Sequence, residues 1–178
     1  IEEKITLMLT EVGMPQGKVK IELNRLDNFT ERGIDTVNFR FSANKNVPLQ
    51  DISKVASGGE LSRLMLCIKS LLSEKLDLPT IIFDEIDTGI SGEIANKVGE
   101  IIKNISKNRQ VINITHLPQI ACKGNYHYLV YKDDSSNRTK TFIKLLSNEE
   151  REIEIARMLS GEEITEAALI NARELLKK

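Results

Sequence analysis

A short apolar run, Thr80-Ile81-Ile82-Phe83, stops abruptly at two adjacent carboxylates, Asp84 and Glu85. A second apolar run, from Val111 to Thr115, stops in the same way at His116. In parallel sheets, ligands bind beyond the carboxyl ends of the strands. We therefore expect the two carboxylates and the imidazole to lie at one edge of a sheet.

Helical patterns surround both runs. One is carried by apolar residues at helical spacing between Leu61 and Leu72, and the next extends from Ile90 to Ser106. Short apolar strands that alternate with helices are typical of α/β proteins, in which helices cover both faces of a mostly parallel sheet. The sequence therefore predicts a fold of this kind.

The segments before this region predict a helix and an antiparallel pair of strands. Apolar residues recur at helical spacing over Ile1–Val12. Alternating residues over Val19–Leu23 and Val37–Phe41 predict two strands that pair with each other. The polar stretch between them, which contains Asn28 and Gly33, is expected to form a turn.

After the second apolar run, the sequence predicts a hairpin and two closing helices. A turn-rich segment separates two strand patterns, Tyr126–Lys132 and Thr139–Leu146. Helical patterns follow over about Glu149–Leu159 and Thr165–Lys177, and Gly161 between them is the expected C-cap.

Composition narrows the possible functions. The 178 residues include 25 basic and 26 acidic side chains, so the net charge of −1 argues against a dedicated nucleic-acid-binding domain, which is usually strongly basic. No apolar run approaches the length of a membrane span. Cys67 and Cys122 form no metal-binding pair, which favours a reduced, cytoplasmic setting. The chain starts at Ile1 with neither an initiator methionine nor a secretory signal, so we expect it to be a piece of a longer chain.

The segment Ser57-Gly58-Gly59-Glu60 has two interpretations. Ser57 and Glu60 fit a capping box at the start of the helix. That box does not explain the two glycines, because each glycine in a helix costs about 1 kcal/mol relative to alanine. Bare backbone amides at a helix N-terminus form an anion site that suits phosphate. Both interpretations predict a helix start, and only the second predicts a ligand.

The polar residues at the two strand ends have either a catalytic interpretation or a structural one. Asp84 could hold a hydrated Mg²⁺, and Glu85 could orient or deprotonate a water molecule. The alternative is a strand that ends in solvated acids, which is common. His116, taken alone, is more often a structural group than a catalytic one. The loop that begins at Asp87 either leads into a helix capped by Ser91 or places the Asp87 carboxylate at the same edge.

One segment imitates a phosphate-binding loop. Residues 13–19 read Gly-Met-Pro-Gln-Gly-Lys-Val, with three residues between the glycines where the Walker A pattern needs four. Val19 stands where that pattern needs a hydroxyl for Mg²⁺. We therefore expect the chain to lack a phosphate cradle of its own.

Four motifs occur in the order found in the C-terminal half of an ABC-type ATPase head. Ser57-Gly58-Gly59-Glu60 resembles the signature motif, Ile81 to Glu85 resembles Walker B with its catalytic glutamate, Asp87 resembles the D-loop and His116 resembles the switch histidine. Three segments have sequences similar to those of the RecN family of bacterial DNA-repair ATPases, which is related to SMC proteins. They are Lys54–Arg63, Phe83–Gly92 and Ile114–Ala121. The resemblance is good from about Pro48 to the end of the chain.

This resemblance implies a role for each motif. In such proteins the Walker A half of the head precedes a long coiled coil, and two complete heads sandwich ATP. Asp84 would hold Mg²⁺, Glu85 would activate the attacking water and His116 would contact the γ-phosphate. The signature residues Ser57, Gly58, Gly59 and Glu60 would bind the nucleotide of the other head, and Asp87 would couple the two sites.

The resemblance also implies the organisation and the partners. Residues 1–12 would be the stump of the returning coiled-coil arm, and residues 13–178 the C-terminal half of the head. This half would be an ATPase only when combined with the Walker A half. The implied partners are that half, a second head in an ATP-dependent homodimer, and DNA through the full-length protein, with ATP and Mg²⁺ as cofactors. The implied location is the cytoplasm, at the nucleoid, with no membrane contact.

Three alternatives stay open at this stage. The chain could come from another SMC-like head. It could come from a transporter subunit, although transporter signatures usually read Leu-Ser-Gly-Gly-Gln, whereas Ala56 precedes the serine here and Glu60 replaces the glutamine. It could also be a non-catalytic interaction module with the same fold, and the presence of Glu85 and His116 argues against that.

Overall fold

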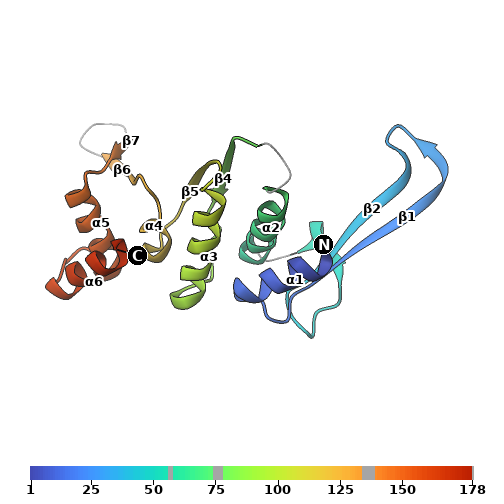
Figure 1. Ribbon diagram of the computed structural model, residues 1–178, viewed down its shortest axis with the longest axis horizontal. Coiled ribbons are helices and arrows are strands. Elements are labelled where there is room, and N and C mark those ends of the chain that lie inside the picture. The colour runs from blue at the N-terminus through green and yellow to red at the C-terminus, as the bar shows by residue number, and fades with distance from the viewer. Residues whose placement is uncertain (56–57, 74–77, 134–138, 178) are drawn as a thin grey trace. The chain divides into compact units, whose positions relative to one another are not determined.

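The computed structural model describes residues 1–55, 58–73, 78–133 and 139–177 (Figure 1). The chain divides into two compact units, Ile1–Ile114 and Thr115–Lys178. The first contains α1 (Glu2–Glu11), β1 (Lys18–Thr30), β2 (Gly33–Ser42), β3 (Gln50–Asp51), the 3₁₀ helix η1 (Ile52–Lys54), α2 (Gly58–Ser73), β4 (Thr80–Asp84), α3 (Gly92–Ile105) and β5 (Gln110–Ile114). The second contains α4 (Pro118–Ala121), β6 (Tyr128–Asp133), β7 (Lys140–Leu145), α5 (Asn148–Ser160) and α6 (Glu166–Leu176).

The predicted α/β region is confirmed. Strand β4 pairs in parallel with β5, so that Thr80 lies opposite Gln110 and Asp84 opposite Ile114. One face of this pair is buried through residues such as Phe83, whose ring centre lies 5.4 Å from the Lys69 ammonium of α2. Helices α2 and α3 also contact each other. The alternation of strand and helix predicted from the apolar pattern therefore builds the first unit.

The expectation that helices cover both sheet faces is wrong for the residues that the structure describes. Ile82, Ile112 and Ile114 are 57%, 44% and 52% exposed. Side chains alternate between the faces of a strand, so these three form one apolar face opposite the buried one. Within the described ranges, β4–β5 is the one parallel pair, and the other paired strands are antiparallel.

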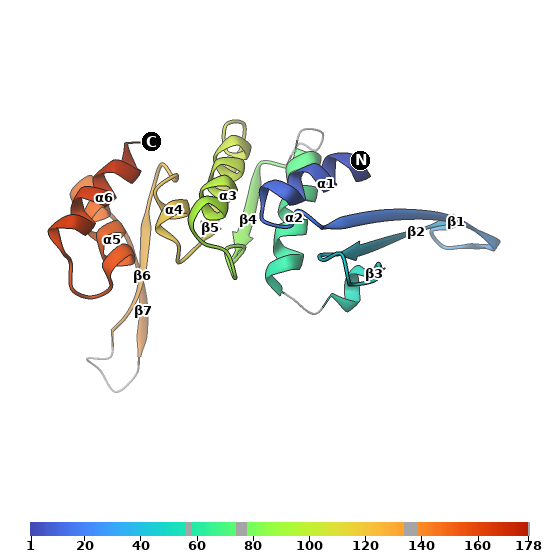
Figure 2. The same cartoon turned by 90° about the horizontal axis from the view of Figure 1, so that it is seen from below.

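The predicted antiparallel pairing of β1 and β2 is confirmed, but both strands are longer than the pattern indicates. Val19 lies opposite Phe41. Asn28 lies inside β1, and the turn is confined to the two residues before Gly33, whose carbonyl accepts a 2.8 Å hydrogen bond from Thr30 Oγ1. The pattern stops early because the far end of the ribbon is mostly exposed, so polar residues are tolerated there. Figures 1 and 2 show the ribbon extending away from α1 and α2.

Helix α1 is anchored in the first unit. It contacts β1, α2 and α3, and it buries Ile5 and Leu9, two of the apolar residues that predicted it. Glu2 Oε1 accepts a 2.7 Å hydrogen bond from the backbone N–H of Ile21. This hydrogen bond lowers the pKa of the Glu2 carboxyl. None of the helices in the described ranges is long and apolar enough to cross a membrane.

Gly13, which follows α1, provides a test of this packing. Its φ is 83°, and a Cβ there would lie 2.7 Å from Ile94 Cδ1. Gly161, the predicted C-cap of α5, has the same φ, but its Cβ would meet no other heavy atom within 4 Å. Both substitutions place a Cβ at a positive φ, and the φ of 83° and ψ of −152° at Gly161 lie in a region that is essentially confined to glycine. Gly13→Ala should lower the free energy of unfolding by about 3 kcal/mol and Gly161→Ala by about 2 kcal/mol, because only the first adds a close contact. Denaturant unfolding of both variants measures the difference, and equal losses would contradict the packing of α1 on α3.

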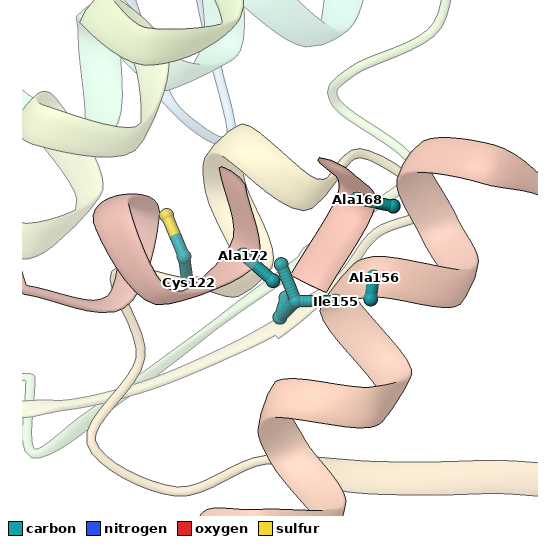
Figure 3. Packing of buried hydrophobic residues seen from close by; sticks show 5 residues of the cluster. All are labelled: Cys122, Ile155, Ala156, Ala168 and Ala172. Carbon is teal, nitrogen blue, oxygen red and sulfur yellow. The ribbon is translucent and has the colours of Figure 1, made fainter. Parts of the chain in front are cut away.

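Small side chains let α5 and α6 pack closely in the second unit. Figure 3 shows its core, which consists of Cys122, Ile155, Ala156, Ala168 and Ala172. Arg151 of α5 donates from Nη2 to the carbonyl oxygens of Cys122, at 2.8 Å, and Gly124, at 2.5 Å. The predicted hairpin forms from β6 and β7, and residues 134–138 of its turn lie outside the described residues.

Candidate functional site

The two carboxylates lie where the sequence predicts them. Asp84 is the last residue of β4 and Glu85 follows it directly, with both residues exposed. The backbone N–H of Glu85 donates to the carbonyl oxygen of Ile114 at 3.2 Å. This bond continues the β4–β5 pairing by one residue, so the carboxylate pair sits at the carboxyl edge of the parallel strands.

Glu85 has an unusual backbone conformation. Its φ is 47°, and it is the one non-glycine residue with a positive φ in the described ranges. The left-handed region costs a residue with a Cβ about 1–2 kcal/mol. The Glu85 carbonyl accepts hydrogen bonds from the N–H of Thr88, at 3.4 Å, and from Thr88 Oγ1, at 3.1 Å. Strained backbone of this kind is concentrated at functional sites.

The loop after Glu85 lies directly against the start of α2. A Cβ at Gly59 would lie 2.5 Å from the carbonyl oxygen of Thr88, so only glycine fits there without displacing the loop. Arg63, one turn further along α2, donates from Nη1 to the same oxygen at 3.0 Å. The structure thus brings the predicted anion-binding segment and the carboxylate loop into one packed unit.

The first glycine of the pair has a different environment. Gly58 is exposed, and a Cβ there would meet no other heavy atom within 4 Å. Glu60 lies in the first turn of the 16-residue helix α2 and is partly exposed. Ser57, the predicted capping and signature residue, lies outside the described residues. Gly59 therefore has a packing role, while Gly58 leaves room for a ligand at the helix start.

Asp87 is fully buried, with 0% of its surface exposed, so its carboxylate does not face solvent. Its carbonyl accepts a 3.3 Å hydrogen bond from the N–H of Ile90. Ser91 occupies the N-cap position of α3, as the turn interpretation predicts, but its side chain makes no capping hydrogen bond. Asp87 therefore lies inside the loop that Gly59 and Arg63 contact.

His116 belongs to the second unit, where it is exposed and lies two residues after the end of β5. The site in the first unit therefore consists of the start of α2 and the end of β4 with its loop. His127, the second histidine, precedes β6 and is half-buried. Burial, with a smaller contribution from the Arg151 charge, lowers the pKa of His127 and favours its neutral form.

Sequence reasoning missed Arg63 and Thr88. Arg63 is only 8% exposed. The residue type alone does not show whether an arginine on a helix is buried or exposed. A partial signal is its position four residues after Gly59, because residues at that spacing lie on the same helical face.

The Asp84 and Glu85 carboxylates fit a Mg²⁺ ion whose remaining ligands are water and the phosphates of a bound substrate. Among the described residues, no three His, Cys, Asp or Glu side chains cluster so that they could hold a metal. Mg²⁺ is usually bound by one or two carboxylates, with water and substrate phosphates completing its octahedral shell. Two exposed carboxylates at a strand end match that donor set.

Solved SMC heads share this fold. A Smc head with coiled coil and joint from Pyrococcus yayanosii aligns with a TM-score of 0.64 and 19% identity, covering 86% of this chain and 28% of that one. A Smc head from Pyrococcus furiosus aligns with a TM-score of 0.60 and 20% identity, covering 89% and 37%. A chain from a study of ATP-driven dimerization of SMC ATPases aligns with a TM-score of 0.56 and 19% identity, covering 91% and 92%.

Sequence relatives are much closer. No protein-family model matches the chain. It is 49% identical over 149 residues to DNA repair protein RecN of Bacillus subtilis, covering 84% of this chain and 26% of that protein. It is 44% identical to RecN of Rickettsia prowazekii and 42% identical to RecN of Haemophilus influenzae, each covering 99% of this chain and 32% of the relative. The chain thus spans about a third or less of the length of these relatives. By sequence along its whole length the chain belongs to the RecN family of DNA repair proteins, and its fold is that of an SMC ATPase head.

Proposed function

We propose that this chain is the C-terminal half of the ATP-hydrolysing head of a RecN-like protein that acts in DNA double-strand-break repair and recombination. The observation that carries the proposal is the contact between the Gly59 turn of α2 and the Thr88 carbonyl of the loop after Asp84 and Glu85. This contact joins a helix start suited to phosphate with a carboxylate pair suited to hydrolysis. Similarity to RecN over the whole chain supports it.

Each motif has a role in this proposal. Asp84 helps to hold Mg²⁺, which would neutralise phosphate charge when bound. Glu85 accepts a proton from the attacking water. His116 contacts the γ-phosphate. The signature residues Ser57, Gly58, Gly59 and Glu60 act in trans on the ATP of a second head, in an ATP-dependent homodimer. Asp87 couples the two sites, and because its side chain is buried, the coupling runs through the loop.

The exposed apolar surface supports a missing half. Large exposed apolar patches mark interaction sites in soluble proteins. Besides the Ile82, Ile112 and Ile114 face, the β1–β2 ribbon exposes Leu23, Phe29, Val37 and Phe39. We propose that the segment carrying Walker A covers these surfaces and supplies the phosphate cradle.

The same proposal covers the coiled-coil arm, the contact with DNA and the location in the cell. Residues 1–12 are the stump of the coiled-coil arm, and the burial of Ile5 and Leu9 supports a junction between the arm and the head at this helix. DNA contact occurs in the full-length protein, because the near-neutral charge of this chain provides no strong electrostatic footprint. The protein acts in the cytoplasm, at the nucleoid.

The direct test is ATP hydrolysis by the chain alone and after co-expression with the Walker A segment. We expect hydrolysis only in the combined sample, because the proposal assigns the phosphate cradle to the Walker A segment. Hydrolysis by the isolated chain would show that the division of roles is wrong. No hydrolysis by a correctly assembled combined head would overturn the proposed activity.

A further inference from the structure

We propose that Arg63 is a positioning residue that holds the Glu85 loop against the start of α2 by binding the carbonyl oxygen of Thr88. The inference rests on the proposed function, because it assigns Arg63 a part in setting the orientation of the hydrolytic glutamate. It concerns a residue outside the four motifs, and it explains how a ligand at the start of α2 could influence the carboxylate pair.

The Thr88 carbonyl is the point at which the two segments meet. Arg63 Nη1 donates to it at 3.0 Å across 25 residues of sequence. Gly59 provides the room for that oxygen, since a Cβ would lie 2.5 Å away. Arg63 and Gly59 are one helical turn apart on α2, so the oxygen is held by one face of a single helix.

The link continues from Thr88 to Glu85. The N–H and Oγ1 of Thr88 both donate to the Glu85 carbonyl, at 3.4 and 3.1 Å. Fixing the Thr88 carbonyl therefore fixes the tight turn in which Glu85 has its positive φ. A strained conformation persists only where surrounding contacts determine it fully. Arg63 supplies such a contact from outside the loop.

The environment of Arg63 favours this role over a loose surface contact. Its side chain is nearly buried, and burial lowers the pKa of its guanidinium, while the nearby Glu60 carboxylate favours the charged form. A buried guanidinium that leaves its acceptor stays unsatisfied, so the bond to Thr88 is expected to persist. In the proposed homodimer, α2 of one head contacts the ATP of the other. Arg63 would then connect that contact to the Glu85 of its own head.

The test uses the complete head with Arg63→Met and Arg63→Lys. Methionine keeps much of the aliphatic length but has no donor. We expect Arg63→Met to lower kcat about 10–100-fold with the KM for ATP within about threefold, because misplacing a catalytic group by about 1 Å has effects of this size. Arg63→Lys, which keeps a charged donor, should recover most of the loss.

The matched control is Arg151→Met, which removes another guanidinium bound to backbone carbonyls, those of Cys122 and Gly124 in the second unit. Amide hydrogen exchange in residues 85–90 should speed up in Arg63→Met and not in Arg151→Met. A kcat for Arg63→Met within about twofold of the unsubstituted head, or an equal kcat loss in Arg151→Met, would overturn the positioning role. If the unsubstituted head does not hydrolyse ATP, the proposed function fails. In that case, unchanged amide hydrogen exchange in residues 85–90 of Arg63→Met would separately overturn the inference that Arg63 holds the loop.

Discussion

Glu85→Gln in the complete head is expected to slow ATP hydrolysis about 10²–10⁴-fold, the usual contribution of a general base, while ATP binding is retained. Glutamine has nearly the same size and shape as glutamate but cannot accept the proton of the attacking water. Glu85 is exposed and its backbone is held by the Thr88 and Ile114 hydrogen bonds, so the substitution should leave the fold intact. Single-turnover hydrolysis and nucleotide binding measure the two effects separately.

Glu93→Gln is a suitable control for this prediction. Glu93 is an exposed acid in the first turn of α3, where it pairs with Lys97 at 3.1 Å. Exposed pairs of this type contribute little, so hydrolysis should stay within about twofold of the unsubstituted head. Near-normal turnover in Glu85→Gln would refute the assignment of Glu85 as the base.

A second variant at the same position separates function from strain. Glycine adopts a positive φ without the penalty that glutamate has at 47°. Glu85→Gly should therefore unfold at the same denaturant concentration as the unsubstituted head or a higher one, while losing hydrolysis as Glu85→Gln does. A loss of stability in Glu85→Gly would show that its carboxylate is needed for the fold, which would weaken the catalytic interpretation.

Much of the first unit was predictable because its signals are local. The runs at Thr80–Phe83 and Val111–Thr115 are short and mostly apolar, as strands of parallel sheets are. Chain direction then places Asp84 and Glu85 at the carboxyl edge, and the parallel pairing of β4 and β5 confirms it. The two closing helices were equally predictable from the sequence. Gly161 is the C-cap of α5 and has a positive φ, as its position predicted.

The remaining features depend on contacts that no local pattern encodes. The bond from Arg63 to Thr88 joins residues far apart in sequence, and the positive φ of Glu85 follows from the turn that this bond supports. The hydrophobic pattern could not mark the end of β1, because the far part of the ribbon buries neither face. The prediction that helices cover both sheet faces was wrong for the face that contains Ile82. A strand face that binds a separate protein segment has the same apolar sequence as one covered by helices of its own chain.

The two glycines of the signature segment should respond differently to the same change. Gly59→Ala places a methyl group 2.5 Å from the Thr88 carbonyl oxygen. That oxygen cannot move freely, because Arg63 binds it and Thr88 also binds Glu85. We therefore expect the free energy of unfolding of the complete head to fall by about 3 kcal/mol, in the upper part of the range for overpacked sites. Hydrolysis should fall with it, since the displaced loop carries Glu85.

Gly58→Ala is the matched substitution one residue earlier, where the added methyl group meets no other heavy atom within 4 Å. Its unfolding free energy should stay unchanged or rise by up to about 1 kcal/mol, because alanine favours the helix. Urea unfolding of the two variants at equal protein concentration measures the contrast. If Gly59→Ala is as stable as Gly58→Ala, α2 does not pack on the loop as described, and the positioning role of Arg63 loses its geometric basis. If only Gly59→Ala is destabilised, the second glycine serves packing, and exposed Gly58 is the one left free to admit a phosphate to the helix start.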